Sequence, residues 1–159
     1  NVDLNPLTID LFNYARPFDI NICCAISNKK TTKKLFFLGD LDSKNTLDPS
    51  HKNWLSKHFK ISKRDFKIRS VKTNTLNSLL KKYDFYQIDF MNIDLEGHEL
   101  EVIKSINFKE FNIKVICVEI LNYDKESKYK KKQLISFLKK KGYYQKGKSE
   151  INYIFQKKQ

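Results

Sequence analysis

Two apolar runs of strand length, at residues 86–94 and 113–121, most constrain the fold of this chain. The first reads YQIDFMNID and the second reads IKVICVEIL, and neither alternates strictly between apolar and polar residues. Such runs are typical of strands that are covered on both faces, as in parallel sheets. Each run is followed by a segment with helical spacing, so the pattern predicts strands that are joined through helices.

The same alternation of apolar and amphipathic segments extends over most of the chain. It predicts an α/β fold: a mainly parallel, doubly wound (Rossmann-like) sheet with helices on both faces and a C-terminal antiparallel hairpin. We expect a single domain over residues 1–159, with an irregular insert at about residues 40–65. Further strands are expected at residues 1–4, 18–27, 34–39, 65–72, 143–146 and 151–156, with Gly147 and Ser149 in the hairpin turn, and helices at 5–15, 49–59, 73–83, 96–106 and 125–142.

The chain carries a formal charge of +13, to which 28 lysines and only three arginines contribute. Specific nucleic-acid recognition relies on arginine, whose planar guanidinium donates paired hydrogen bonds, and the lysines here are spread along the chain. We therefore expect a solvated basic surface and no nucleic-acid partner, with a lysine-rich nucleic-acid-binding domain as the alternative. No apolar run approaches the length of a membrane span, so no transmembrane helix is expected.

The three cysteines, Cys23, Cys24 and Cys117, all lie in apolar runs. This placement predicts buried free thiols rather than a disulfide framework or a metal site. No basic-then-apolar leader opens the chain, so a cytoplasmic protein is expected. The sequence specifies no oligomeric state.

Acidic residues gather directly after the first apolar run, where Asp94, Glu96 and Glu99 surround Gly97 together with His98. Ligands bind beyond the carboxyl ends of parallel strands, so this cluster is a candidate site. Acidic residues in the first turn of a helix also interact favourably with its dipole, by ~0.3–1 kcal/mol each, which is a purely structural alternative. A hard-cation site made from Asp94, Glu96 and Glu99 is a third alternative, but the spacing matches no recognised loop for such cations, so no metal is expected. His98 is expected to be a partly exposed helix residue.

A second strand end, in the segment NVDLNP, carries Asp3 and Asn5. Asn5 can cap the helix that begins at Pro6, and Asp3 can serve as a turn residue, so both have structural alternatives. If the sheet is parallel, Asp3 and Asp94 are expected along the same rim.

The motif from Ile93 to Glu99, followed by a helix and by a strand that ends in Val118 and Glu119, resembles the FkbM-type methyltransferases. These are S-adenosylmethionine-dependent O-methyltransferases. The segments NVDLNP, CCAIS and NYIF also resemble strands of that family, so the resemblance covers most of the chain and is weakest near residues 40–65. The sequence departs from the family pattern in two ways. It has Asn92 where many members carry lysine. The family's first strand and its glycine-containing loop, which should precede NVDLNP, are missing. The resemblance therefore implies an N-terminally incomplete domain.

The resemblance implies S-adenosyl-L-methionine as cofactor, with Asp3 and Asn5 at its ribose and Ser27 at its adenine. It implies catalytic roles for Asp94, as a base or as an orienting group for an acceptor hydroxyl, and for its neighbours Glu96 and Glu99. The acceptor is expected to be a hydroxyl of a sugar or other small metabolite. The alternative is a catalytically inactive relic or interaction domain that keeps the fold.

Two further features have open interpretations. Glu119 can contact the acceptor or pair with a lysine. The lysine-rich run at residues 128–132 is expected to be a solvated helix face.

Overall fold

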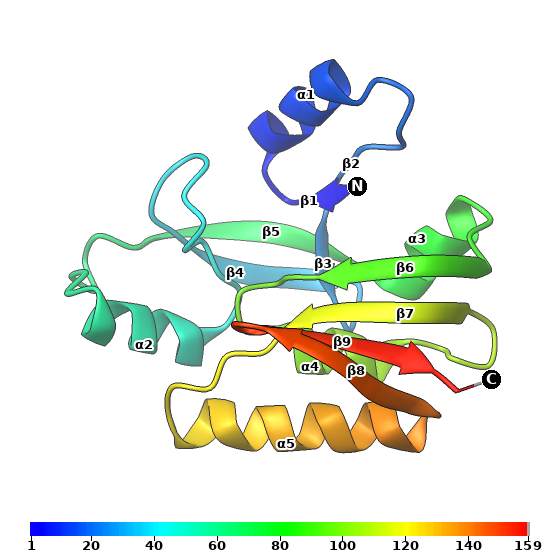
Figure 1. Cartoon of the computed structure of the whole chain (residues 1–159). Coiled ribbons are helices and arrows are strands. Elements are labelled where there is room, and N and C mark those ends of the chain that lie inside the picture. The colour runs from blue at the N-terminus through cyan, green and yellow to red at the C-terminus, as the bar shows by residue number, and fades with distance from the viewer. Residues whose placement is uncertain (159) are drawn as a thin grey trace. The chain divides into compact units, whose positions relative to one another are not determined.

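Five helices and nine strands alternate along residues 1–158, which are the residues that the computed structural model describes (Figure 1). The chain divides into two compact units, Asn1–Asn74 and Thr75–Gln159. No helix within residues 1–158 is long and apolar enough to cross a membrane.

The first unit contains a pair of short parallel strands, β1 (Val2–Asp3) and β2 (Ile22–Cys23), joined through α1 (Pro6–Ala15). Asn5 is the N-cap of α1, because its side chain accepts a hydrogen bond from the backbone N–H of Leu7 at 3.0 Å. Pro6 follows at the first helical position, where its missing N–H has no effect. The sequence therefore specifies the start of this helix locally.

The first unit also contains a three-stranded sheet, in the order β3 (Ala25–Ser27), β5 (Lys67–Thr75) and β4 (Thr31–Phe37). Strands β4 and β5 are antiparallel. Helix α2 (Pro49–His58) lies in the segment expected to be irregular, at the position expected for a short helix. Its Leu55 packs in a small core with Phe36 and Phe66.

The second unit contains the C-terminal sheet, in the order β6 (Gln87–Ile93), β7 (Asn112–Glu119), β9 (Asn152–Lys157) and β8 (Tyr143–Ser149). Strands β6 and β7 are parallel, whereas β9 runs antiparallel to both of its neighbours. Three helices belong to this unit: α3 (Leu76–Lys82), α4 (Glu99–Ser105) and α5 (Lys125–Lys140).

The main core lies between this sheet and its helices. Ile116 and Val118 of β7 are fully buried, and their cross-strand partners in β9 are Phe155 and Tyr153. Because alternate residues of a strand share a face, these four side chains mark the covered face of the sheet. Leu138 of α5 packs in the same cluster, together with residues of α4.

The α/β class is confirmed, whereas a doubly wound, mainly parallel sheet is not. The strands form three separate sheets in residues 1–158, and the largest is mixed, because the terminal hairpin places β9 between β7 and β8 and so adds two antiparallel pairings to the parallel pair β6–β7. The antiparallel hairpin itself is confirmed. Its turn lies at residues 150–151, with Glu150 at a φ of 52°, while Gly147 sits at a register shift inside β8.

Several predicted boundaries differ from the structure for local reasons. The strand expected at residues 18–27 divides into β2 and β3, and the polar residues from Thr31 onward belong to β4. Thr75 caps α3, so residues 73–75 complete β5 instead of starting the helix. The prediction of buried cysteines was wrong, since Cys23 is exposed and Cys24 and Cys117 are partly exposed; all three are free thiols.

Candidate active site

The carboxyl ends of β6 and β7 bring two acidic side chains together. In the parallel register Ile93 lies beside Val118, so the residues that follow, Asp94 and Glu119, are neighbours as well. Their carboxyl groups share a hydrogen bond. Two hydrogen-bonded carboxyl groups can share a proton, whereas two ionised carboxylates would repel each other.

Glu119 is the member of the pair whose pKa is raised. Burial, the charge of Asp94 and the hydrogen bond to Asp94 raise the pKa of Glu119 to about 8. The charges of Glu96 and Glu99 act in the same direction. The pair therefore favours a singly protonated state, in which one hydrogen bond links the two carboxyl groups.

A tight turn directly follows Asp94. The N–H of His98 donates to the carbonyl of Leu95 at 3.3 Å, and the two central residues, Glu96 and Gly97, have φ angles of 49° and 97°. Positive φ at both central positions is the geometry of a type I′ turn, which suits glycine and costs a side-chain-bearing residue ~1–2 kcal/mol. This turn delays the start of α4 from the expected residue 96 to Glu99.

The buried carboxylate of Glu99 holds the turn closed. Its Oε1 atom accepts the backbone N–H of Leu95 at 2.9 Å and that of Gly97 at 3.0 Å. Only 6% of Glu99 is exposed. Burial raises the pKa of Glu99 to about 7, and the charge of Asp94 adds to this effect, although hydrogen bonds from the backbone N–H groups of Glu99, Leu95 and Gly97 oppose it. Glu99 thus stabilises the strained backbone that carries Asp94 and Glu96.

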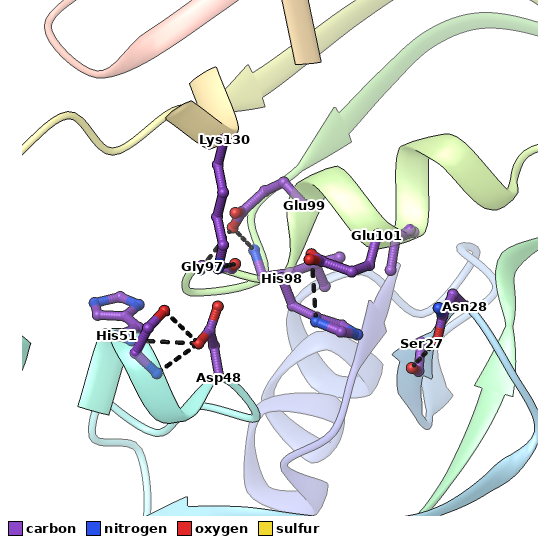
Figure 2. Close-up of polar contacts among 12 residues, drawn as sticks. Ser27, Asn28, Asp48, His51, Gly97, His98, Glu99, Glu101 and Lys130 are labelled. Atoms are coloured by element: carbon purple, nitrogen blue, oxygen red, sulfur yellow. Dashed lines mark hydrogen bonds and ion pairs between the residues drawn. The ribbon is translucent and has the colours of Figure 1, made fainter. Parts of the chain in front are cut away.

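Lys130 of α5 also contacts the turn. Its Nζ atom donates to the carbonyl of Gly97 at 3.4 Å (Figure 2). The same atom lies 3.7 Å from Oε1 of Glu126. The prediction of a solvated face was wrong for this residue, whose side chain is only 23% exposed. A cation is thereby held next to the acidic turn.

His98 is buried rather than partly exposed, which corrects the expectation from the sequence. It is the N-cap residue of α4, and its Nδ1 atom lies 3.6 Å from Oε2 of Glu101 (Figure 2). His98 therefore has a place in the packing beneath the turn.

The other predicted site residues lie in the first unit. Oδ1 of Asp3 accepts the N–H of Asn5 at 2.7 Å, which fixes the carboxylate at the end of β1. The Oδ2 atom of Asp3 has no protein partner within residues 1–158, and the amide nitrogen of Asn5 has none in the same range. Ser27 is fully buried and its hydroxyl donates to Oδ1 of Asn28 at 3.2 Å. The distance from Asp3 to Asp94 stays a prediction.

The structure thus joins Asp94, Glu96 and Glu99 into one local site, and adds Glu119 and Lys130 to it. The sequence contained a signal for Glu119, because the last residues of two adjacent parallel strands must lie side by side. It contained no such signal for Lys130, since that contact depends on how α5 packs. Within the part of the chain that the structure describes, no three potential ligand side chains are arranged to hold a metal ion.

Comparison with protein families gives a match over most of the chain. The family model described as Methyltransferase FkbM domain matches residues 1–144, which is most of the chain. No curated protein and no solved structure gives a significant match.

Proposed function

This chain belongs to the Methyltransferase FkbM domain family, and from that membership we propose that it transfers a methyl group from S-adenosyl-L-methionine to a hydroxyl oxygen. The observation that carries this proposal is the Asp94–Glu119 carboxyl pair at the carboxyl ends of two parallel strands. Such strand ends are where open α/β sheets bind ligands.

Asp94 is the proposed proton acceptor. Alkylation of an alcohol requires that the hydroxyl proton leave, and a carboxylate within hydrogen-bond reach can take it. Because the raised pKa of Glu119 favours one proton shared by the pair, the pair keeps one negative charge with which it can accept the proton of the acceptor. General-base assistance of this kind contributes roughly 10²–10⁴ in rate.

Glu96 and Glu99 have different proposed roles. Glu99 is a positioning residue, since its buried carboxylate binds backbone N–H groups of the turn. Glu96 contributes negative charge that keeps the proton on Glu119. Lys130 limits the total negative charge of the site through its contact with the turn.

Asp3 and Asn5 are the proposed cofactor-binding residues. The cofactor supplies an electrophilic methyl group when it is bound. Asp3 fits a ribose diol because its carboxylate is fixed at a strand end and has an oxygen without a protein partner within residues 1–158. The amide nitrogen of Asn5 is available to donate alongside it. Ser27 is fully buried, so we assign it a supporting role under the adenine side of the site.

A sugar or another small polyol remains the proposed acceptor class. Carboxylate-lined sites suit neutral hydroxyls, since they accept the hydrogen bonds that hydroxyls donate. An interaction domain without activity is the competing proposal, and the two differ in cofactor binding.

Calorimetric titration of the full chain with S-adenosylhomocysteine separates the two proposals. We expect saturable heat from the wild type, and weaker binding from Asp3→Asn because a charged acceptor for the ribose is lost. Asp10→Asn, on an exposed position of α1, is the matched control and should bind as the wild type does. Absence of heat from the folded protein, titrated together with any segment that its gene encodes upstream of Asn1, would favour the interaction domain.

The role of Asp94 is tested by Asp94→Asn with tritium-labelled methyl donor and a panel of monosaccharides and glycosides. The variant should lose roughly 10²–10⁴ of the turnover while its affinity for S-adenosylhomocysteine stays unchanged. Equal losses in turnover and in affinity would instead assign Asp94 a structural role.

A further inference from the structure

A buried tyrosine between two lysines forms a second polar cluster in the C-terminal unit. Lys131 of α5 donates from Nζ to the hydroxyl oxygen of Tyr153 at 2.6 Å, and the same Nζ atom lies 4.8 Å from the centre of the ring. Lys148 of β8 lies with its Nζ atom 5.3 Å from that ring centre. We call these three residues the Lys–Tyr–Lys cluster.

Strand register places the cluster near the carboxyl end of β7. Tyr153 in β9 pairs with Val118 in β7 on one side and with Lys148 in β8 on the other. The next pair along β9 and β7 is Asn152 with Glu119. The cluster therefore lies one residue pair from the end of β7. Because neighbouring residues of a strand point to opposite faces, Tyr153 extends toward α5 and not to the face of Glu119.

The charges of the cluster are not balanced by acidic residues. Among residues 1–158, neither Lys131 nor Lys148 has a carboxylate within ion-pair distance, and both interact instead with the hydroxyl of Tyr153. Burial alone would raise the pKa of Tyr153, but the hydrogen bonds and positive charges of the two lysines outweigh burial and lower it. Two cations around one phenol leave unused capacity to bind an anion.

We propose that the Lys–Tyr–Lys cluster binds the phosphate group of a small molecule. The two ammonium groups supply the positive charge, and the hydroxyl of Tyr153 can accept from Lys131 while it donates its own proton to a phosphate oxygen. A phosphate has three acceptor oxygens and nearly two negative charges at neutral pH, which match three donors and two cations better than a carboxylate does. This site does not depend on methyl transfer, and its test needs no cofactor.

The test uses the full chain labelled with ¹³C at Cζ of tyrosine, whose NMR signal reports the hydroxyl environment. Tyr153→Phe assigns the signal by its disappearance. Titration with inorganic phosphate at constant ionic strength should shift the Tyr153 signal to saturation at millimolar concentrations. Lys131→Gln and Lys148→Gln should each weaken binding about fivefold or more, and Lys131→Arg should restore most of it because the charge is kept.

Lys146→Gln is the matched control, because Lys146 is an exposed lysine of the same strand as Lys148. It should bind phosphate as the wild type does. Equal weakening by Lys146→Gln, or full binding by a folded Lys131→Gln/Lys148→Gln double variant, would overturn the proposal, since either result means general attraction to a basic protein. Tighter binding of glucose 6-phosphate than of inorganic phosphate would identify a phosphate ester as the ligand, and equal binding would identify the free anion.

Discussion

Replacement of Glu99 by glutamine should change how the stability of the protein depends on pH. Glu99 has an ordinary pKa of 4.5 in the unfolded chain, and burial raises its pKa to about 7 in the folded chain. Between these values the folded chain holds a proton that the unfolded chain has lost. The contribution of Glu99 to stability is therefore fully present below about pH 4.5 and is lost as the pH rises through about 7.

The size of this effect follows from the difference between the two pKa values. At about 1.36 kcal/mol per pH unit, that difference corresponds to a loss of about 3 kcal/mol in the free energy of unfolding across the window. Little of this is screened by solvent, because Glu99 is almost fully buried. Glu99→Gln keeps an oxygen that can accept from Leu95 and Gly97 but does not titrate, so it should lack this dependence.

Urea denaturation followed by far-ultraviolet circular dichroism, at intervals from pH 4.5 to 8, measures the effect. The stability of Glu99→Gln relative to the wild type should rise by about 3 kcal/mol toward the alkaline end. Other titrating groups, such as Glu119, are present in both proteins and cancel to first order. Glu126→Gln is the control, since the side chain of Glu126 is 57% exposed. The free energy of unfolding of this variant should depend on pH as that of the wild type does. Parallel curves for Glu99→Gln and the wild type would refute the reasoning from burial.

Three further substitutions have defined outcomes. The turnover of the wild type should decline near pH 8, where Glu119 loses its proton. Glu119→Gln should remove this decline, since the amide still donates to Asp94 but does not titrate, and a decline that persists in the variant would assign that titration to another group. Gly97→Ala should lower the free energy of unfolding by ~1–2 kcal/mol, because the φ of Gly97 is 97°, and an unchanged thermal midpoint would contradict the strained turn. Asp124→Ala should cost ~1 kcal/mol by removing the capping box with Ser127 at the start of α5, whereas Asp124→Asn should keep most of the thermal stability.

The sequence alone determined those features that depend on a few neighbouring residues. The start of α1 follows from Asn5 and Pro6, and the apolar runs predicted at residues 86–94 and 113–121 contain nearly all of β6 and β7. The motif from Ile93 to Glu99 identified the family, which the match over residues 1–144 confirmed. Propensity, capping and motif spacing are local, so they can be read from short segments.

Tertiary structure decided which distant side chains meet and how far each is buried. The pairing of Asp94 with Glu119 needs the register of two strands, and the contact of Lys130 with the turn needs the packing of α5. The terminal hairpin entered the sheet beside β7, so the expected mainly parallel sheet became mixed. A pKa of about 7 at Glu99 likewise results from loss of solvent around it. Desolvation sums over neighbours from the whole fold, and no short segment contains that information.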